Sequence, residues 1–150
     1  MKIQAPVINV ADTLRLIVIN LGKLTLACRI EAVYKIVSYT KIHSSGLGYT
    51  GLTNIDGHSV MVVDLHRKLF KVSVADRPEY FVIIKPQIGD LLAIPVTESP
   101  NLMDIQREYI RVLPESYRQS DTLAIASHVA VVPHNEKTLT IFVIDETSLM

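Results

Sequence analysis

The chain has 150 residues, of which 49% are hydrophobic and 20% are charged, and its 15 basic and 15 acidic side chains give a net charge of zero. This length predicts one domain whose core needs no disulfide or metal for support. The hydrophobic content excludes a disordered chain, and the balanced charge excludes a general electrostatic attraction to nucleic acid or anionic lipid.

A single cysteine, Cys28, excludes an internal disulfide framework and fits a reducing compartment. The N-terminus has no long apolar stretch before Asp12 and Arg15, so we expect no secretory signal. The uncharged run 123–133 is too short to cross a bilayer, which takes about 20 apolar residues. The sequence therefore predicts a cytoplasmic protein that does not insert into a membrane.

The apolar residues occur in short runs separated by turn residues, a pattern typical of strands. In chain order, we predict a hairpin over 14–28 that turns at 20–23, a strand over 60–63 buried on both faces, a hairpin over 80–94 that turns at 87–90, and a hairpin over 129–144 that turns at 133–137. Strands without βαβ alternation indicate an all-β barrel or sandwich.

Helical signals are confined to two short segments. Residues 31–37 would place Val33, Ile36 and Val37 on one face of a helical turn. This face would either line an apolar groove for a partner helix or close the core, and the pattern leaves both alternatives open. Residues 64–70 suit a second short turn. The mixed segment 71–79, which contains a proline, is the expected joint between two subdomains.

The motifs that would indicate cofactor or metal chemistry have simpler interpretations. Residues 46–51 match GxGxxG, but the Asn, Asp and Gly that follow at 52–57 disfavour the helix that a dinucleotide site needs. His128 and His134 bracket a predicted strand without a third metal ligand. Cys28, between apolar neighbours, is interpreted as a buried structural thiol. We therefore expect neither a cofactor nor a metal.

Enzymatic function is disfavoured because no GxSxG, Ser-x-x-Lys or paired-carboxylate motif stands out in the sequence as a catalytic constellation. An aromatic content of 6% without tryptophan also disfavours a stacking surface for nucleic acid. We expect a binding protein that is not an enzyme. Two alternatives stay open: a sensory β-barrel that binds a small molecule, and a hydrolase whose Ser, His and Asp converge only in space.

Residues 51–57, followed by the apolar run 60–63 and Asp64-Leu65, resemble the centre of the CheW-like domain. That family has the pattern Gly-Val-Ile-Asn-Leu-Arg-Gly, then an apolar strand, then Asp-Leu-Arg. Further landmarks agree in order and spacing, namely Leu21-Gly22, residues 33–36, residues 88–96, Leu113-Pro114 and residues 140–149. The resemblance extends from about Leu14 to Leu149 and covers nearly the whole chain.

The resemblance implies one domain over residues 1–150, with a tail over about 1–12 and two small five-stranded β-barrels packed together. Family members without added domains are non-catalytic adaptors. They link the cytoplasmic tips of methyl-accepting chemoreceptors to the regulatory domain of a CheA-type histidine kinase. The implied role is that of a stand-alone adaptor in chemotaxis, phototaxis or pilus motility.

Several positions depart from the family pattern. Lys35 stands where Glu is common, Asp56 where Arg is usual, and His66 where a second Arg is found. Met61 replaces a frequent strand proline, and Pro95 replaces an aspartate. Charges at the rim of an interface contribute strongly to partner choice. The joint reversal at Lys35 and Asp56 therefore predicts partners with matching reversed charges; the alternative is that both positions are solvated and have drifted.

The resemblance and the apolar face predicted for residues 31–37 together give a set of candidate partner-binding residues. Asn54 and Gly57 are expected mainly to shape their loop, and Asp64 to cap the turn that follows it. The candidates are Val33, Lys35, Ile36, Val37, Asn54, Asp56 and His66.

Overall fold

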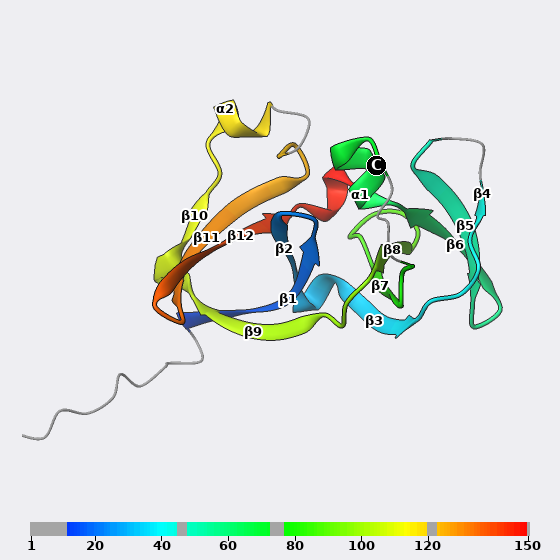
Figure 1. The fold of residues 1–150 in the computed structure, drawn as a ribbon, viewed down its shortest axis with the longest axis horizontal. Helices are drawn as coiled ribbons and strands as arrows, with labels where there is room; N and C mark the ends of the chain where they lie inside the picture. The colour runs from blue at the N-terminus through cyan, green and yellow to red at the C-terminus, as the bar shows by residue number, and fades with distance from the viewer. Residues whose placement is uncertain (1–11, 45–47, 73–76, 120–122, 150) are drawn as a thin grey trace, which may run out of the picture.

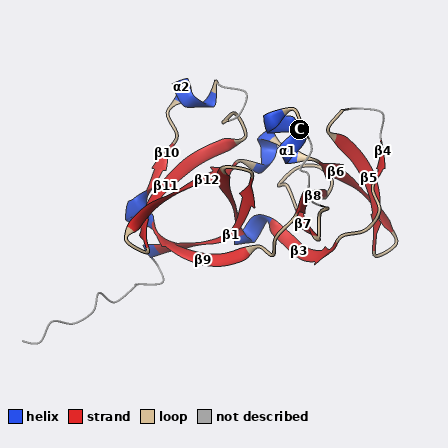
Figure 2. Cartoon of the chain, viewed as in Figure 1, coloured by secondary structure: helices blue, strands red, loops and turns tan. Residues whose placement is uncertain are grey.

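The chain folds into two curved β-sheets of six strands each, seen side by side in Figure 1. This computed structural model describes residues 12–44, 48–72, 77–119 and 123–149. Strands dominate and helical segments are short (Figure 2). Among the described residues, the helices are too short or too polar for any of them to cross a membrane.

The first sheet has the strand order β10-β11-β12-β2-β1-β9. All neighbouring pairs are antiparallel except β12 and β2, which run in parallel. Its strands are β1 (Thr13–Leu21), β2 (Leu24–Arg29), β9 (Asn101–Gln106), β10 (Ile110–Val112), β11 (Ala126–His134) and β12 (Lys137–Ile144).

The second sheet has the order β3-β7-β8-β6-β5-β4, again with one parallel pair, β6 with β8. Its strands are β3 (Val33–Ser38), β4 (His43–Ser44), β5 (Thr50–Ile55), β6 (His58–Val63), β7 (Tyr80–Ile84) and β8 (Leu92–Val96). The helical segments are η2 (Ile30–Ala32), α1 (Leu65–Phe70), η3 (Arg107–Tyr109), α2 (Glu115–Arg118) and η4 (Glu146–Ser148).

The chain distributes its strands between the sheets in an interleaved order. The hairpin β1–β2 lies in the first sheet, whereas the next four strands, β3 to β6, lie in the second. The hairpin β7–β8 then joins the second sheet, and β9 to β12 return to the first. Each half of the chain thus builds most of one sheet and contributes a hairpin to the other.

The predicted all-β class with two packed β units is confirmed, and so are the three hairpins. Each sheet has six strands, one more than the predicted five, because short β10 and β4 add to its edge. The predicted joint at 71–79 connects α1 to β7, whereas the chain passes between the sheets at 30–32 and 97–100. Residues 73–76 of that joint and 1–11 of the predicted tail lie outside the described residues.

Many strands are apolar on both faces because each face lines a different core. On β7, Phe81 and Ile83 point into a cluster enclosed by the second sheet. Val82 and Ile84, which alternate with them, point into a larger cluster between the two sheets. A strand with period-two side chains can serve two cores only if both sets are apolar. The prediction that β6 is buried on both faces fails at Met61, which is 36% exposed.

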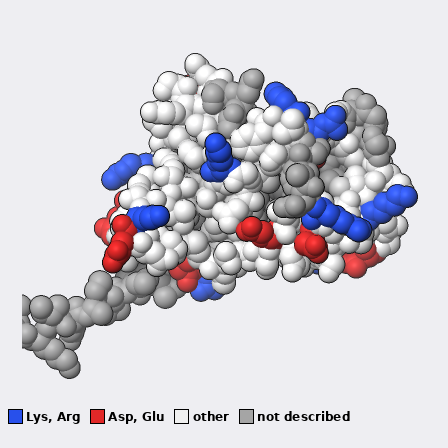
Figure 3. All heavy atoms as spheres, in the orientation of Figure 1, with Lys and Arg blue, Asp and Glu red and all other residues white. Residues whose placement is uncertain are grey.

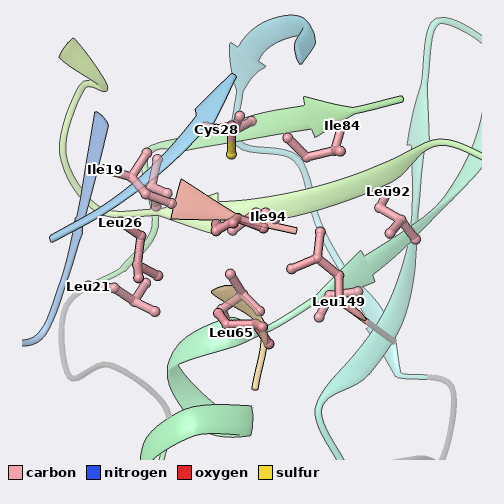
Figure 4. Packing of buried hydrophobic residues seen from close by; sticks show 14 of the residues in the cluster. Ile19, Leu21, Leu26, Cys28, Leu65, Ile84, Leu92, Ile94 and Leu149 are labelled. Atoms are coloured by element: carbon pink, nitrogen blue, oxygen red, sulfur yellow. The ribbon is translucent and has the colours of Figure 1, made fainter. Parts of the chain in front are cut away.

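The larger cluster, called the shared core below, holds the two sheets together. Side chains from both sheets point toward one another in Figure 4, and α1 and the C-terminal segment close the same space. Its labelled members are Ile19, Leu21, Leu26, Cys28, Leu65, Ile84, Leu92, Ile94 and Leu149. Besides the cluster that each sheet encloses, the two sheets therefore share a core, and they are not independent units joined by a linker.

The two predicted helical turns have different outcomes. The turn over 64–70 is confirmed as α1, and Asp64 caps it by accepting a hydrogen bond of 3.1 Å from Arg67 N. The turn over 31–37 is wrong, because only Ile30–Ala32 form a single 3-10 turn and strand β3 follows. Valine and isoleucine favour a strand, and β7 provides the antiparallel partner that makes it possible.

The alternation on β3 predicts opposite responses at two of its residues. Val33 packs against the shared core, whereas Ile36 is 39% exposed. We expect Val33→Asp to lower the free energy of unfolding by about 2–4 kcal/mol, because an unpaired charge is buried. Ile36→Asp, on the same strand, serves as the control and should unfold close to wild type in urea. Equal losses for both variants would contradict this assignment of the two faces.

Cys28 gives a second prediction, on pH. Its side chain is fully buried, and burial, together with the negative charge of Glu146, raises the pKa of the thiol to about 12. The unfolded chain ionises this thiol from its ordinary pKa of 9.0 upward, whereas the folded chain keeps it protonated. The contribution of the protonated Cys28 thiol to the free energy of unfolding is therefore complete below pH 9.0 and is lost between pH 9.0 and about 12.

Urea unfolding of wild type and Cys28→Ala over this pH range measures the effect, since the variant lacks the thiol but keeps the other titrating groups. As the pH rises through this range, we expect the free energy of unfolding of wild type to fall relative to that of Cys28→Ala by ~1.4 kcal/mol per pH unit. A difference that does not change with pH would contradict the buried, protonated thiol.

Candidate partner-binding surface

The two positions with reversed charges form an ion pair with each other. Lys35 lies on the edge strand β3, Asp56 lies in the turn between β5 and β6, and Lys35 Nζ donates a hydrogen bond to Asp56 Oδ2. This hydrogen bond raises the pKa of Lys35, and the negative charge of Asp56 adds to the effect. The ammonium is thus held charged, and the two departures from the family pattern form one structural unit.

The β5–β6 turn explains why Asp56 is presented in this way. Asp56 and Gly57 form a two-residue loop with φ values of 52° and 82°, a left-handed backbone that Asp tolerates and Gly favours. Asn54 Oδ1 accepts a hydrogen bond of 3.1 Å from Gly57 N and closes the loop. Asn54 and Gly57 therefore shape the turn, as predicted, and Asp56 projects from it with 68% of its side chain exposed.

The apolar candidates on β3 divide between core and surface. Val33 packs against the shared core and Val37 against the cluster enclosed by the second sheet. For these two residues the core alternative holds. Ile36 is 39% exposed and Tyr34 is 54% exposed, and these two alternate with the inward-facing residues. Tyr34 is not among the candidates that the sequence predicts.

His66 lies elsewhere on the molecule. It belongs to α1, its Nδ1 is 2.6 Å from Val72 O, and its ring centroid is 4.9 Å from that of Phe70. Figure 1 shows α1 and β3 on opposite sides of the view. His66 is therefore not part of the surface around Lys35 and Asp56, and its contacts anchor the end of α1.

A groove of about 1000 Å³ is lined in part by Tyr34, whose ring centroid lies 5.7 Å from Lys35 Nζ, so the groove borders the ion pair. Leu52 and Met61, which are cross-strand partners on β5 and β6, line it together with Tyr34 of β3 and Ile88 of the β7–β8 connection. These four apolar side chains are exposed by 44%, 36%, 54% and 90%, respectively. His58 and Asp90 supply polar groups to the lining. Exposed apolar side chains gathered in one place are typical of binding surfaces.

Sequence reasoning missed the four apolar residues of this groove. The one local signal is Ile88, an isoleucine at the tip of a hairpin where polar residues are the rule. Leu52 and Met61 become neighbours only through the β5–β6 register. The groove residues are thus brought together by pairing and not by any sequence motif.

The glycine motif at 46–51 has a structural explanation where it is described. Strand β5 begins at Thr50, so the motif leads into a strand and not into the helix that a dinucleotide site requires. A Cβ atom at Gly51 would lie 2.5 Å from Ile42 Cγ2 and 3.0 Å from His43 O. Glycine is therefore required for the close approach of β4 to β5. Residues 45–47 lie outside the described part of the chain.

The described residues offer little for metal or acyl-transfer chemistry. Within them, no group of three or more His, Cys, Asp or Glu side chains is placed to hold a metal ion. Ser127 Oγ lies 2.8 Å from His128 Nδ1, yet no carboxylate in the described part is hydrogen-bonded to His128, so the triad that the hydrolase alternative needs is not formed there.

The interiors of both curved sheets are filled by side chains. The first sheet encloses Leu16, Ile105 and Ile141, and the second encloses Phe81 and Ile83, all exposed by 2% or less. A small-molecule-binding β-barrel needs an interior cavity, and the described residues give that alternative no support. On the face shown in Figure 3, basic and acidic side chains are interspersed and do not form a large patch of one sign.

Comparison with known proteins identifies the family. The CheW-like domain matches residues 15–147, which include strands of both sheets. The crystal structure of the scaffolding protein TtCheW from Thermoanaerobacter tengcongensis is similar, with a TM-score of 0.72 over 89% of this chain and 84% of that chain, at 16% sequence identity. No curated protein sequence matches the chain. The chain therefore belongs to the family of CheW-like domains, which are scaffolding modules without catalytic activity of their own.

Proposed function

We propose that this protein is a cytoplasmic adaptor that couples chemoreceptors to a CheA-type histidine kinase in chemosensory signalling. The observation that carries the proposal is the match of the CheW-like domain to residues 15–147, almost the whole described chain. Membership of this family implies both partners. A rigid domain with two curved sheets suits the role, because it presents two faces at a fixed angle.

The groove beside Lys35 and Asp56 is the proposed contact surface for one of these partners. Apolar side chains at its centre and charged groups at its border follow the usual arrangement of protein interfaces. Tyr and Met, both present here at Tyr34 and Met61, are enriched in such interfaces. Ile36, exposed on the same strand as Tyr34, extends the apolar surface along β3.

The experiment that tests the proposed function is affinity capture with the tagged full chain from native lysate, followed by mass spectrometry. We expect a histidine kinase and methyl-accepting chemoreceptors to be retained together. Direct binding is then measured with the purified regulatory domain of that kinase and with a soluble receptor tip. Recovery of neither partner, or no measurable binding of either purified fragment, would overturn the proposal.

A surface variant locates the contact. Ile88 is 90% exposed in the groove, so Ile88→Asp should leave the melting temperature unchanged and weaken binding of at least one partner by about tenfold, since a buried apolar contact would be replaced by a charge. Val112→Asp is the matched control, because Val112 is 71% exposed on β10 of the other sheet. Equal affinity of wild type and Ile88→Asp for both partners would rule out the groove as a contact surface.

A further inference from the structure

The Lys35–Asp56 pair connects two elements that the chain does not join directly. Lys35 is on edge strand β3, and Asp56 is 21 residues further on, in the β5–β6 turn. The side chains are 37% and 68% exposed. Because water screens such a pair, its contribution to folding stability is small. Its consequence is positional: it fixes one positive and one negative charge at defined places on the surface.

Both charges remain available to a partner. A lysine ammonium has three donor hydrogens and a carboxylate accepts at two oxygens, whereas their contact uses Nζ and Oδ2 alone. The ammonium also lies 5.7 Å from the centroid of the Tyr34 ring, which belongs to the groove. The positive charge is thus held against an exposed aromatic side chain at the border of the apolar surface.

The fold determines on which side each charge of the pair lies. Lys35 is placed by β3 and its pairing with β7, and Asp56 by the left-handed two-residue turn. A partner that covers the groove therefore meets a cation on the β3 side and an anion on the turn side. The CheW-like pattern has Glu and Arg at the same two positions, which is the opposite order of charges.

We infer that the order of charges in the Lys35–Asp56 pair selects the partner that binds the adjacent groove. The selected partner is a protein surface with an apolar centre, an acidic group opposite Lys35 and a basic group opposite Asp56. A surface suited to the opposite order would bring like charges together and would be rejected. This inference rests on the proposed function and adds to it the feature by which one adaptor distinguishes its own partner from related ones.

The test reverses the pair without removing it. The variant Lys35→Glu with Asp56→Arg keeps an internal ion pair and exchanges its charges. Its melting temperature should lie slightly below that of wild type, because arginine tolerates the left-handed backbone of position 56 less well than aspartate does. Affinities for the kinase regulatory domain and for the receptor tip are measured by calorimetry. We expect binding of one partner to weaken about tenfold and binding of the other to stay unchanged, because the pair lies on one face only.

The chain provides a matched control in Arg15 and Asp104, a second exposed pair at 2.8 Å between β1 and β9 of the other sheet. Exchanging that pair with Arg15→Asp and Asp104→Arg should leave both affinities unchanged. A neutral variant, Lys35→Gln with Asp56→Asn, keeps side chains of similar size without their charges and should bind with intermediate affinity. It tests the inference in place of the reversed variant if that variant is less stable.

The outcomes separate this inference from the function on which it rests. Wild type that binds neither fragment overturns both. If wild type binds and the Lys35–Asp56 reversal binds equally well, the inference alone is overturned. The adaptor function is then left in place. An equal loss for both reversals would also overturn it, because general electrostatics would then explain the effect.

Discussion

Apolar packing between the two sheets is the constraint on which the rest of the molecule depends. The shared core draws side chains from β1 and β2 of one sheet, β7 and β8 of the other, α1 and the C-terminal segment. Its members are buried, and the C-terminal segment is tied in by Arg29–Glu146 and Arg118–Asp145 ion pairs. Because interiors are close-packed, a change in this space is transmitted to both sheets, and the angle between the outer faces is fixed by it.

This arrangement separates the residues that hold the fold from those that are exposed on its outer surface. On β3, Val33 and Val37 face the interior, whereas Tyr34 and Ile36 face outward. Outer residues can change charge or size without disturbing the packing beneath them. The 16% identity that accompanies a TM-score of 0.72 with TtCheW shows that this fold tolerates extensive change in sequence.

The sequence predicts the hairpins well, because their turns and strands are neighbours in the chain. It fails where a contact depends on distant pairing. Residues 31–37 have helical spacing, yet their strand partner β7 begins at Tyr80 and no local pattern reveals it. Lys35 and Asp56 can each be identified as unusual, but their contact follows from the curvature of the sheet. The groove is hardest to foresee, since Leu52 and Met61 come from the two arms of one hairpin and Ile88 comes from the connection of another.

The exchange of hairpins between the halves has a consequence for how the protein is made. β1 and β2 leave the ribosome well before their neighbours β9 and β12, because the six strands of the second sheet lie between β2 and β9 in the chain. The first sheet therefore cannot form completely until β12 has been synthesised, and its long-range pairings make folding slow compared with a protein of local contacts. Until then, the apolar sides of the nascent hairpin remain exposed, a state that is prone to aggregation.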